Sequence, residues 1–119
     1  MITGTHTVLY ATDPAAARAF LRDVLGLANV DAGDGWLIFK LPPHELGVHP
    51  TGPDGEGTHE LYFLCDDIES TVADLRAKGV EFTSDVTDRR FGLVVTFKVP
   101  GAGEMGLYEP HHPTAYDLP

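Results

Sequence analysis

The sequence is short of basic residues, and this shortage excludes one class of partner. Eight Lys and Arg residues stand against eighteen Asp and Glu residues, which gives a formal net charge of −10 at pH 7. A chain with this charge repels phosphate backbones, so we expect no nucleic acid partner. The acidic residues are scattered along the chain, and solubility is the simplest role for them.

Cysteine and long hydrophobic runs are also scarce. The single cysteine, Cys65, lies in the apolar run 61–65, where a small buried thiol is much commoner than a nucleophile. No window approaches the roughly 20 apolar residues of a membrane span. No basic segment precedes an apolar stretch near the N-terminus. We therefore expect a cytoplasmic protein with no membrane partner.

Several motifs of catalysis and nucleotide binding are missing as well. The sequence contains no Gly-rich phosphate loop before a helix, no CxxC pair and no GxSxG motif. What it does contain is 43% hydrophobic residues in a chain of 119, enough for a single domain over residues 1–119.

Two segments carry the signals of amphipathic helices. The first has Asp13 as N-cap and Pro14 at the first helical position, and it ends at Gly26. The second has Asp67 as N-cap and ends at Gly79. The apolar faces consist of Ala17, Phe20, Leu21, Val24 and Leu25 in the first helix and Ile68, Val72 and Leu75 in the second.

Each helix follows one strand-like run and precedes three more, which predicts an α+β protein of two tandem βαβββ modules. The first module covers about residues 1–52 and the second about 57–112. Strands are expected at 5–10, 28–31, 36–41 and 45–49, and again at 60–65, 81–84, 93–99 and 104–109. Short echoes favour a duplicated unit, since Thr5-His6 recurs as Thr58-His59.

Three stretches carry a family likeness: HTVLYATDPAAARAFLRDVLGL, ELYFLCDDIESTVADLRAKGVEF and PGAGEMGLYEP. They resemble the vicinal-oxygen-chelate superfamily, which includes glyoxalases, bleomycin resistance proteins and extradiol dioxygenases. The resemblance implies that the two modules form a cupped mixed β-sheet with helices on the outside. It also implies that the cup holds a small molecule and that a homodimer completes it. In metal-dependent members, a divalent ion polarises two adjacent oxygens of the substrate.

The resemblance further implies a place for each metal ligand. His6 has the first position, and Glu60 has the second, since both stand seven residues before the N-cap of the next helix. His59 and Glu109 would complete a two-His-one-carboxylate set with His6. We reject both, because His59 is one residue out of register and alternation turns Glu109 toward the helix.

The usual glutamate ligand of the last strand falls on Gly106, so the ligand set of the family is incomplete. Glu45 or His49 would supply a replacement from the end of the first module. With His6 and Glu60, either would make a mixed nitrogen and oxygen site suited to Fe, Mn, Ni or Zn.

Aromatic residues form the second set of candidates. Alternation places Tyr10, Tyr62 and Tyr108 on the concave faces, and with Trp36 and His49 they make the predicted ligand pocket. We therefore predict a protein that resembles bleomycin resistance proteins, binds or sequesters a small aromatic ligand, and has a degenerate metal site. The alternative is a metal-dependent lyase, isomerase or ring-cleaving dioxygenase.

Overall fold

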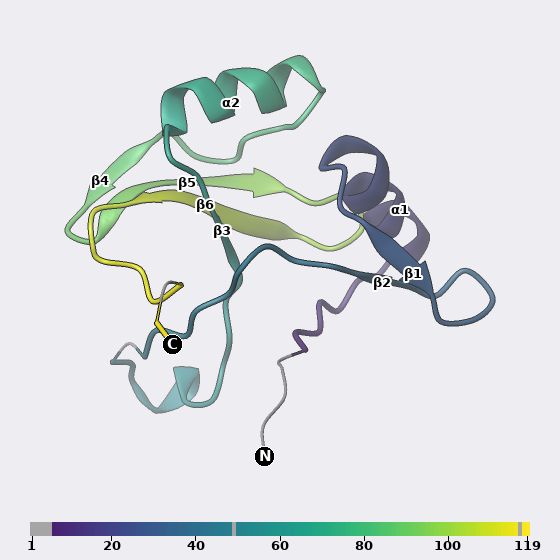
Figure 1. Cartoon of the computed structure of the whole chain (residues 1–119), viewed down its shortest axis with the longest axis horizontal. Coiled ribbons are helices and arrows are strands. Elements are labelled where there is room, and N and C mark those ends of the chain that lie inside the picture. Colours follow the sequence, from purple (N-terminus) through teal and green to yellow (C-terminus); the bar gives the residue numbers. More distant parts are fainter. Residues whose placement is uncertain (1–5, 49, 117) are drawn as a thin grey trace.

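The computed structural model describes residues 6–48, 50–116 and 118–119, which form an α+β fold with two β-sheets. Along the chain come α1 (Pro14–Ala19), a π-helix (Phe20–Val24), β1 (Asn29–Asp31), β2 (Leu37–Phe39), a 3-10 helix (Pro53–Gly55), β3 (Tyr62–Leu64), α2 (Ile68–Ala77), β4 (Thr87–Arg89), β5 (Gly92–Lys98) and β6 (Glu104–Pro110). Figure 1 shows α2 along one face of the larger sheet, with α1 and the β1-β2 sheet to one side. Within the described ranges, no helix has the length and apolar character needed to cross a bilayer.

The second half of the chain forms a four-stranded sheet in the order β3-β6-β5-β4. β3 runs parallel to β6, and β5 is antiparallel to both β6 and β4. Parallel strands such as β3 and β6 need a long crossover connection, and α2 is part of this connection. The helix therefore covers one face of the sheet. The predicted βαβββ order of the second module is confirmed. The strand expected at 81–84 is reduced to a bridge between Phe82 and Phe97, and β4 follows it.

The first half differs from its prediction at two strands. β1 and β2 occur within the expected ranges 28–31 and 36–41 and pair antiparallel. Residues 6–10 and 45–48, however, carry no strand, and residues 5 and 49 lie outside the described residues. A strand persists only where a neighbour satisfies its backbone hydrogen bonds, and in the described part of this chain no strand pairs with either segment. In the described part of the chain, the strands therefore form one sheet of two strands and one of four.

The helix boundaries follow the predicted capping residues. The Asp13 carboxylate accepts a hydrogen bond from Ala16 N at 3.1 Å, and the Asp67 carboxylate accepts one from Ser70 N at 3.0 Å. Gly79, just past α2, has a φ of +90°, a conformation that costs glycine little because it has no Cβ. The second half of the first helix is a π-helix, which the capping and periodicity signals did not predict.

The hydrophobic core lies between α2 and the larger sheet and extends to α1. Its buried members are Ala17, Phe20, Ile68, Val72, Val80, Val95, Phe97, Val99, Met105 and Leu107. The Phe97 ring is 6.3 Å from the ring of Phe20 and 6.2 Å from the ring of Phe82, measured between centroids. Full burial of a large apolar side chain contributes about 1.5–3 kcal/mol. Phe97 therefore helps to hold the two halves of the chain together.

A backbone contact joins the start of α1 to the turn between β5 and β6. Thr12 N and Asp13 N both donate to the carbonyl oxygen of Gly101, at 2.7 and 3.1 Å. Gly101 has a φ of +76°, and a Cβ at this position would lie 2.5 Å from the carbonyl oxygen of Asp13. Glycine is the residue that permits this close approach.

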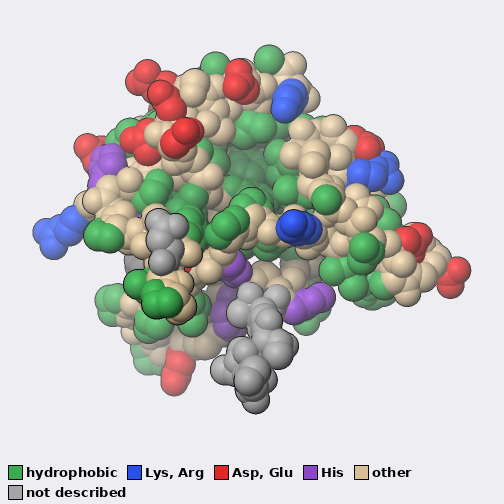
Figure 2. Space-filling view, viewed as in Figure 1, with side chains coloured by type: hydrophobic (Ala, Val, Ile, Leu, Met, Phe, Trp, Pro, Cys, Tyr) green, Lys and Arg blue, Asp and Glu red, His purple; other side chains and the backbone are tan. Residues whose placement is uncertain are grey.

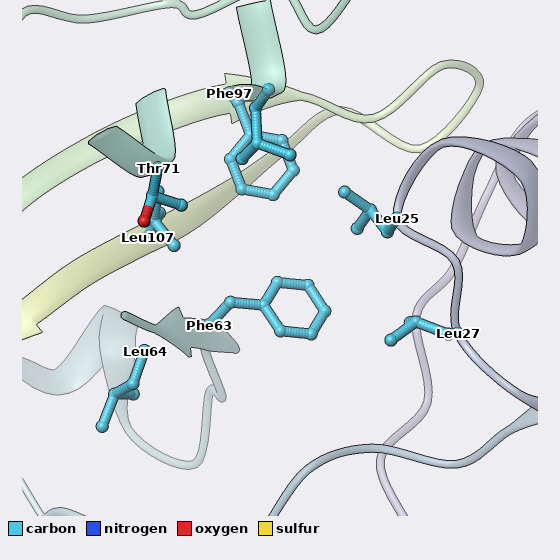
Figure 3. Close-up of a pocket in the computed structure, with 8 residues that line it drawn as sticks. Leu25, Leu27, Phe63, Leu64, Thr71, Phe97 and Leu107 are labelled. Carbon is cyan, nitrogen blue, oxygen red and sulfur yellow. The ribbon is translucent and has the colours of Figure 1, made fainter. Parts of the chain in front are cut away.

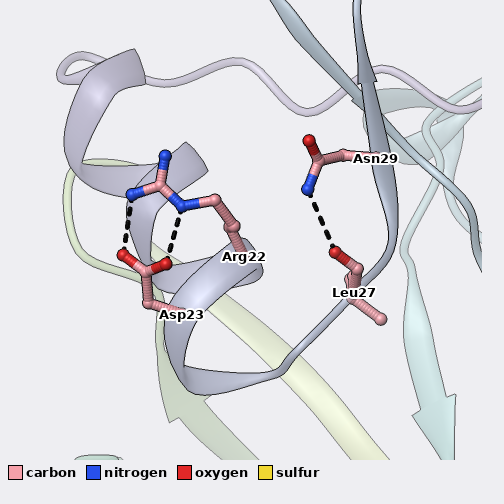
Figure 4. A network of polar contacts seen from close by, with 4 residues as sticks. All are labelled: Arg22, Asp23, Leu27 and Asn29. Carbon is pink, nitrogen blue, oxygen red and sulfur yellow. Dashed lines mark hydrogen bonds and ion pairs between the residues drawn. The ribbon is translucent and has the colours of Figure 1, made fainter.

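The polar contacts near the end of the first helix are exposed. Arg22 donates twice to the Asp23 carboxylate, at 2.6 and 2.7 Å, and Asn29 Nδ2 donates to the carbonyl oxygen of Leu27 at 3.3 Å (Figure 4). An ion pair in open solvent contributes little to stability. The apolar contacts of Phe20 therefore matter more than these charges for the position of the helix.

Replacement of Gly101 by Ala should destabilise the protein more than replacement of Gly103 by Ala. Both glycines have a left-handed φ, +76° and +78°, but a Cβ meets other atoms within 4 Å only at Gly101. We expect the free energy of unfolding, measured in urea, to fall by about 1 kcal/mol for Gly103→Ala. For Gly101→Ala we expect a fall of about 2–4 kcal/mol, because the clash adds to the strain. Equal losses would show that the turn does not contact the start of α1.

Candidate functional site

Side-chain alternation along β6 separates the core from a second, more exposed face of the sheet. Met105 and Leu107 are buried in the core with α2, so Gly106 and Tyr108 lie on the opposite face. On the neighbouring strand β3, Phe63 packs against the core, which places Tyr62 on the same face as Tyr108. This face lies on the side of the sheet away from α2.

Three half-buried rings form a series on this face, and we call Tyr62, Tyr108 and Phe91 the aromatic face. The Tyr62 and Tyr108 rings meet edge to face, with centroids 5.5 Å apart and planes at 84°. Phe91 meets Tyr108 in the same way, at 5.6 Å and 90°. Aromatic pairs of this geometry contribute about 0.5–1.5 kcal/mol beyond the area that they bury. The series joins β3, β6 and the turn between β4 and β5.

Both phenol groups of the aromatic face have polar partners. The Tyr62 hydroxyl donates to Glu60 Oε2 at 2.9 Å. The Tyr108 hydroxyl lies 3.0 Å from His112 Nε2, and His112 Nδ1 lies 2.8 Å from the carbonyl oxygen of Pro113. A carbonyl oxygen can only accept, so Nδ1 carries a proton. Nε2 of the neutral imidazole therefore accepts from Tyr108.

His112 is a site residue that sequence reasoning missed. Its position in the tail, beyond the last strand, is typical of a solvated imidazole. The available signal is its spacing, because Tyr108 and His112 are four residues apart across Pro110. A bend at residues 111–112, directly after β6, brings the imidazole back onto the phenol.

Burial and nearby charges shift the ionisation of both phenols. Burial raises the pKa of Tyr62 above its usual value, and the hydrogen bond to Glu60 raises it further, while the Arg89 guanidinium acts in the opposite direction. Burial also raises the pKa of Tyr108, with a further increase from the Glu45 carboxylate. Glu45, Glu60 and Arg89 are therefore the charged groups that shift the pKa values of the two tyrosines.

Glu45 holds the C-terminal segment beside this face. Its Oε2 accepts a hydrogen bond from Ala115 N at 2.8 Å, across 70 residues of sequence. Burial and Glu45 together raise the pKa of Tyr116. Figure 1 shows the C-terminal segment turning back from the end of β6 on the side away from α2. On that side, histidine side chains border a hollow in the surface (Figure 2).

Four other residues considered for the site from the sequence have exposed side chains. His6, His59 and Tyr10 are exposed, and Tyr10 is 88% exposed. Trp36 is also exposed, with the Arg18 guanidinium 5.0 Å above the centre of its ring. His49 lies outside the described residues.

Glu109 serves α2 instead of the aromatic face. Its Oε1 accepts a hydrogen bond from Ile68 N, the first residue of α2, at 3.1 Å. Its Oε2 lies 3.5 Å from His111 Nε2. A carboxylate at a helix N-terminus satisfies a free backbone donor and complements the helix dipole. This contact occupies one oxygen of the carboxylate.

An apolar cavity of about 180 Å³ lies on the core side of the sheet (Figure 3). Its lining residues are Leu25, Leu27, Phe63, Leu64, Thr71, Leu75, Phe97 and Leu107. Figure 3 shows Phe63 pointing from β3 toward Leu25 and Leu27. Ligand sites carry several convergent polar groups, whereas the lining side chains here offer one hydroxyl, that of Thr71. We assign this space to packing between the two halves of the chain.

A second cavity, of about 330 Å³, lies where the C-terminal segment passes the ends of β3 and β6. Its lining residues are Leu64, Cys65, Asp66, Glu109, Pro110, Thr114 and Tyr116. Burial raises the pKa of the Cys65 thiol. A raised pKa keeps the thiol protonated at neutral pH, which does not suit a nucleophile.

A family model described as Glyoxalase/Bleomycin resistance protein/Dioxygenase superfamily matches residues 5–112. The chain belongs to this superfamily. It is 28% identical over 127 aligned residues to the uncharacterized protein YaeR of Escherichia coli (strain K12), a match that covers 87% of this chain and 93% of YaeR.

Solved structures of the superfamily share the fold of this chain. Lactoylglutathione lyase from Agrobacterium tumefaciens matches with a TM-score of 0.62 at 23% identity, over 87% of this chain and 90% of the lyase. TnmS3, an antibiotic binding protein from Streptomyces sp. CB03234, matches with a TM-score of 0.63 at 21% identity, over 92% of this chain and 99% of TnmS3. At such identities, these matches establish the fold alone.

The described candidates for metal ligands, His6, Glu45 and Glu60, do not form a group. Among the described residues, no three His, Cys, Asp or Glu side chains are arranged to hold an ion. Glu60 accepts from Tyr62, Glu45 accepts from Ala115, and His6 lies in an exposed segment. The described side chains, as arranged, do not fit a divalent ion, so we derive no chemistry through one.

Substitution of Glu60 by Gln should lower the pKa of Tyr62 while leaving it above the ordinary value of 10.0, because burial remains the larger cause. Since the folded-state pKa is the higher one, the phenol stabilises the protein below about pH 10, and this stability is lost as the pH rises through the folded-state pKa. NMR titration of ¹³Cζ-labelled tyrosine measures each phenol separately. Glu45→Gln is the matched control and should lower the pKa of Tyr108 instead. An unchanged pKa of Tyr62 in Glu60→Gln would contradict the hydrogen bond.

Proposed function

We propose that this protein binds or sequesters a small aromatic ligand on the aromatic face, without metal chemistry. The observation that carries the proposal is the series Tyr62, Tyr108 and Phe91 on one side of the sheet. Edge-to-face pairs expose ring surface on which a planar ligand would stack. Glu60 and His112, which hold the two hydroxyls, would supply the polar contacts that orient the ligand.

The superfamily contains proteins with this kind of role. TnmS3, which shares the fold at 21% identity, is described as an antibiotic binding protein. Lactoylglutathione lyase, which shares it at 23% identity, represents the enzymes. The proposal favours the binding role because the carboxylates that a metal would need are engaged by Tyr62 and Ala115. The alternative is a metal-dependent lyase, isomerase or dioxygenase, and metal analysis distinguishes such an enzyme from a binding protein.

We also propose that a homodimer covers the exposed segments of the first half. Val8, Tyr10, Leu46 and Val48 are 58%, 88%, 86% and 90% exposed. Apolar side chains in segments with unpaired backbone groups favour strand addition by another chain. A second copy presents the same segments by symmetry. Pairing of this kind would also bring Tyr10 and Trp36 toward a shared cup.

Tyr108→Ala should weaken the binding of an aromatic compound by about five- to twelvefold, since the loss of one stacked ring removes about 1–1.5 kcal/mol. Thermal shift with naphthalene-, indole- and quinoline-type compounds finds the ligand, and calorimetry measures its Kd. Val30→Ala is the control, because Val30 is a 65% exposed apolar residue on the other sheet. Compounds that shift neither protein, or an equal Kd for Tyr108→Ala and Val30→Ala, would sink the proposed aromatic site.

Metal analysis separates binding from metal-dependent catalysis. The chain, purified without a histidine tag, chelated and reloaded with Fe, Mn, Ni, Co or Zn, should hold far less than one ion per chain. One ion per chain that is lost in His6→Ala would refute metal-free binding and favour the enzyme.

The mass in solution should be twice the chain mass of 12.9 kDa. Leu46→Asp with Val48→Asp should give a monomer, because charges desolvated in an apolar interface are costly. Sedimentation equilibrium measures both. Leu118→Asp, at a 73% exposed tail residue, is the control and should remain dimeric. A monomeric wild-type chain at micromolar concentration would exclude the homodimer.

A further inference from the structure

We infer that Tyr62 and Gly106 are a matched pair: the Tyr62 ring fills the space that a side chain at position 106 would need, and so sets the shape of this corner of the aromatic face. Tyr62 is then a specificity-determining residue for the proposed ligand. The inference rests on the proposed function and deepens it, because it names Tyr62 as the residue whose ring occupies the place of a metal ligand at position 106.

The steric fit is direct. Tyr62 on β3 stands opposite Gly106 on β6 in the parallel register. A Cβ on Gly106 would overlap Cδ1 and Cε1 of the Tyr62 ring and lie 3.1 Å from its Cγ. Gly106 is itself buried beneath the ring.

The backbone does not explain the glycine. Gly106 lies in the middle of β6 and is absent from the positive-φ residues of the described chain, so its conformation is open to any residue. Glycine in a strand interior weakens the strand and often marks a close approach of another group. Here that group is the Tyr62 ring, and the requirement for glycine is one of space.

The ring is held on three sides. Gly106 lies beneath it, Tyr108 meets it edge to face at 5.5 Å, and Glu60 accepts its hydroxyl at 2.9 Å. These contacts fix both the position of the ring and the direction of the phenol.

The pair also explains the missing metal ligand at position 106. A glutamate there, which the family resemblance leads one to expect, would have to pass through the Tyr62 ring. The ring requires glycine, and glycine provides no carboxylate. The phenol of Tyr62 donates to Glu60, which the family resemblance also makes a candidate metal ligand. This corner of the site therefore consists of a ring and a phenol-bound carboxylate.

A double-mutant cycle without ligand tests the pair. Gly106→Ala should lower the Tm by about 3–8 °C, because the ring must swing outward and lose Tyr108 and Glu60. The same change in Tyr62→Phe should cost a similar amount, because the ring remains. In Tyr62→Ala it should cost less than about 2 °C, because the clash is gone. Equal losses in all three backgrounds would overturn the inference.

Two further measurements keep the test decisive. The pKa of Tyr62 should fall in Gly106→Ala, as the ring leaves its half-buried place and Glu60; an unchanged pKa would count against the pair. If Gly106→Ala alone does not fold, the double variant Tyr62→Ala with Gly106→Ala replaces it. A double variant that folds with the Tm of Tyr62→Ala supports the pair, and one that does not fold overturns it. If the three losses of Tm are equal but aromatic compounds still bind, only the matched pair is refuted. If the losses differ as expected but no compound binds, the proposed function is refuted and the steric pair remains.

Discussion

The alternation of side chains along β6 is the constraint on which the core and the candidate site both depend. Met105 and Leu107 enter the core beneath α2, while Gly106 and Tyr108 face the other side of the same strand. β6 is also the strand that β3 and β5 share, in parallel and antiparallel pairing. A shift of its register by one residue would expose the core residues and bury the tyrosine. Core packing therefore holds the aromatic face in place.

The site itself is assembled from distant parts of the chain around this strand. Tyr62 comes from β3, Phe91 from the turn before β5, and His112 from the segment after β6. Glu45 reaches the same region from the first half and binds the tail backbone at Ala115. The carboxylates Glu45 and Glu60 serve here as hydrogen-bond acceptors for the protein. A chain of the glyoxalase and bleomycin resistance superfamily can thus keep the fold while its predicted ligand positions make other contacts.

The two halves of the chain differ in the size of their sheets and in how well their helices are packed. The second half buries its helix on a four-stranded sheet, whereas the first keeps α1 and a two-stranded sheet with exposed flanks. Phe20 against Phe97, and Gly101 against the start of α1, attach the first half to the second. A two-stranded sheet is marginal without further packing. This asymmetry agrees with the proposed dimer.

Local chemistry allowed much of this structure to be predicted from sequence. Asp13 and Asp67 mark helix starts, Gly26 and Gly79 mark helix ends, and the βαβββ order of the second half follows from alternation, because each of these signals acts within a few residues. Three contacts were decided by tertiary structure alone: Tyr62 over Gly106, His112 on Tyr108, and Glu45 on the tail. The lack of a strand at the described residues 6–10 and 45–48 also lay beyond the sequence, because a strand needs a partner that its own residues do not specify. The sequence by itself therefore determined the two helix starts, most of the strands and the face on which Tyr62 and Tyr108 stand. Which side chains meet on that face depends on distances between strands, and only the folded chain sets those.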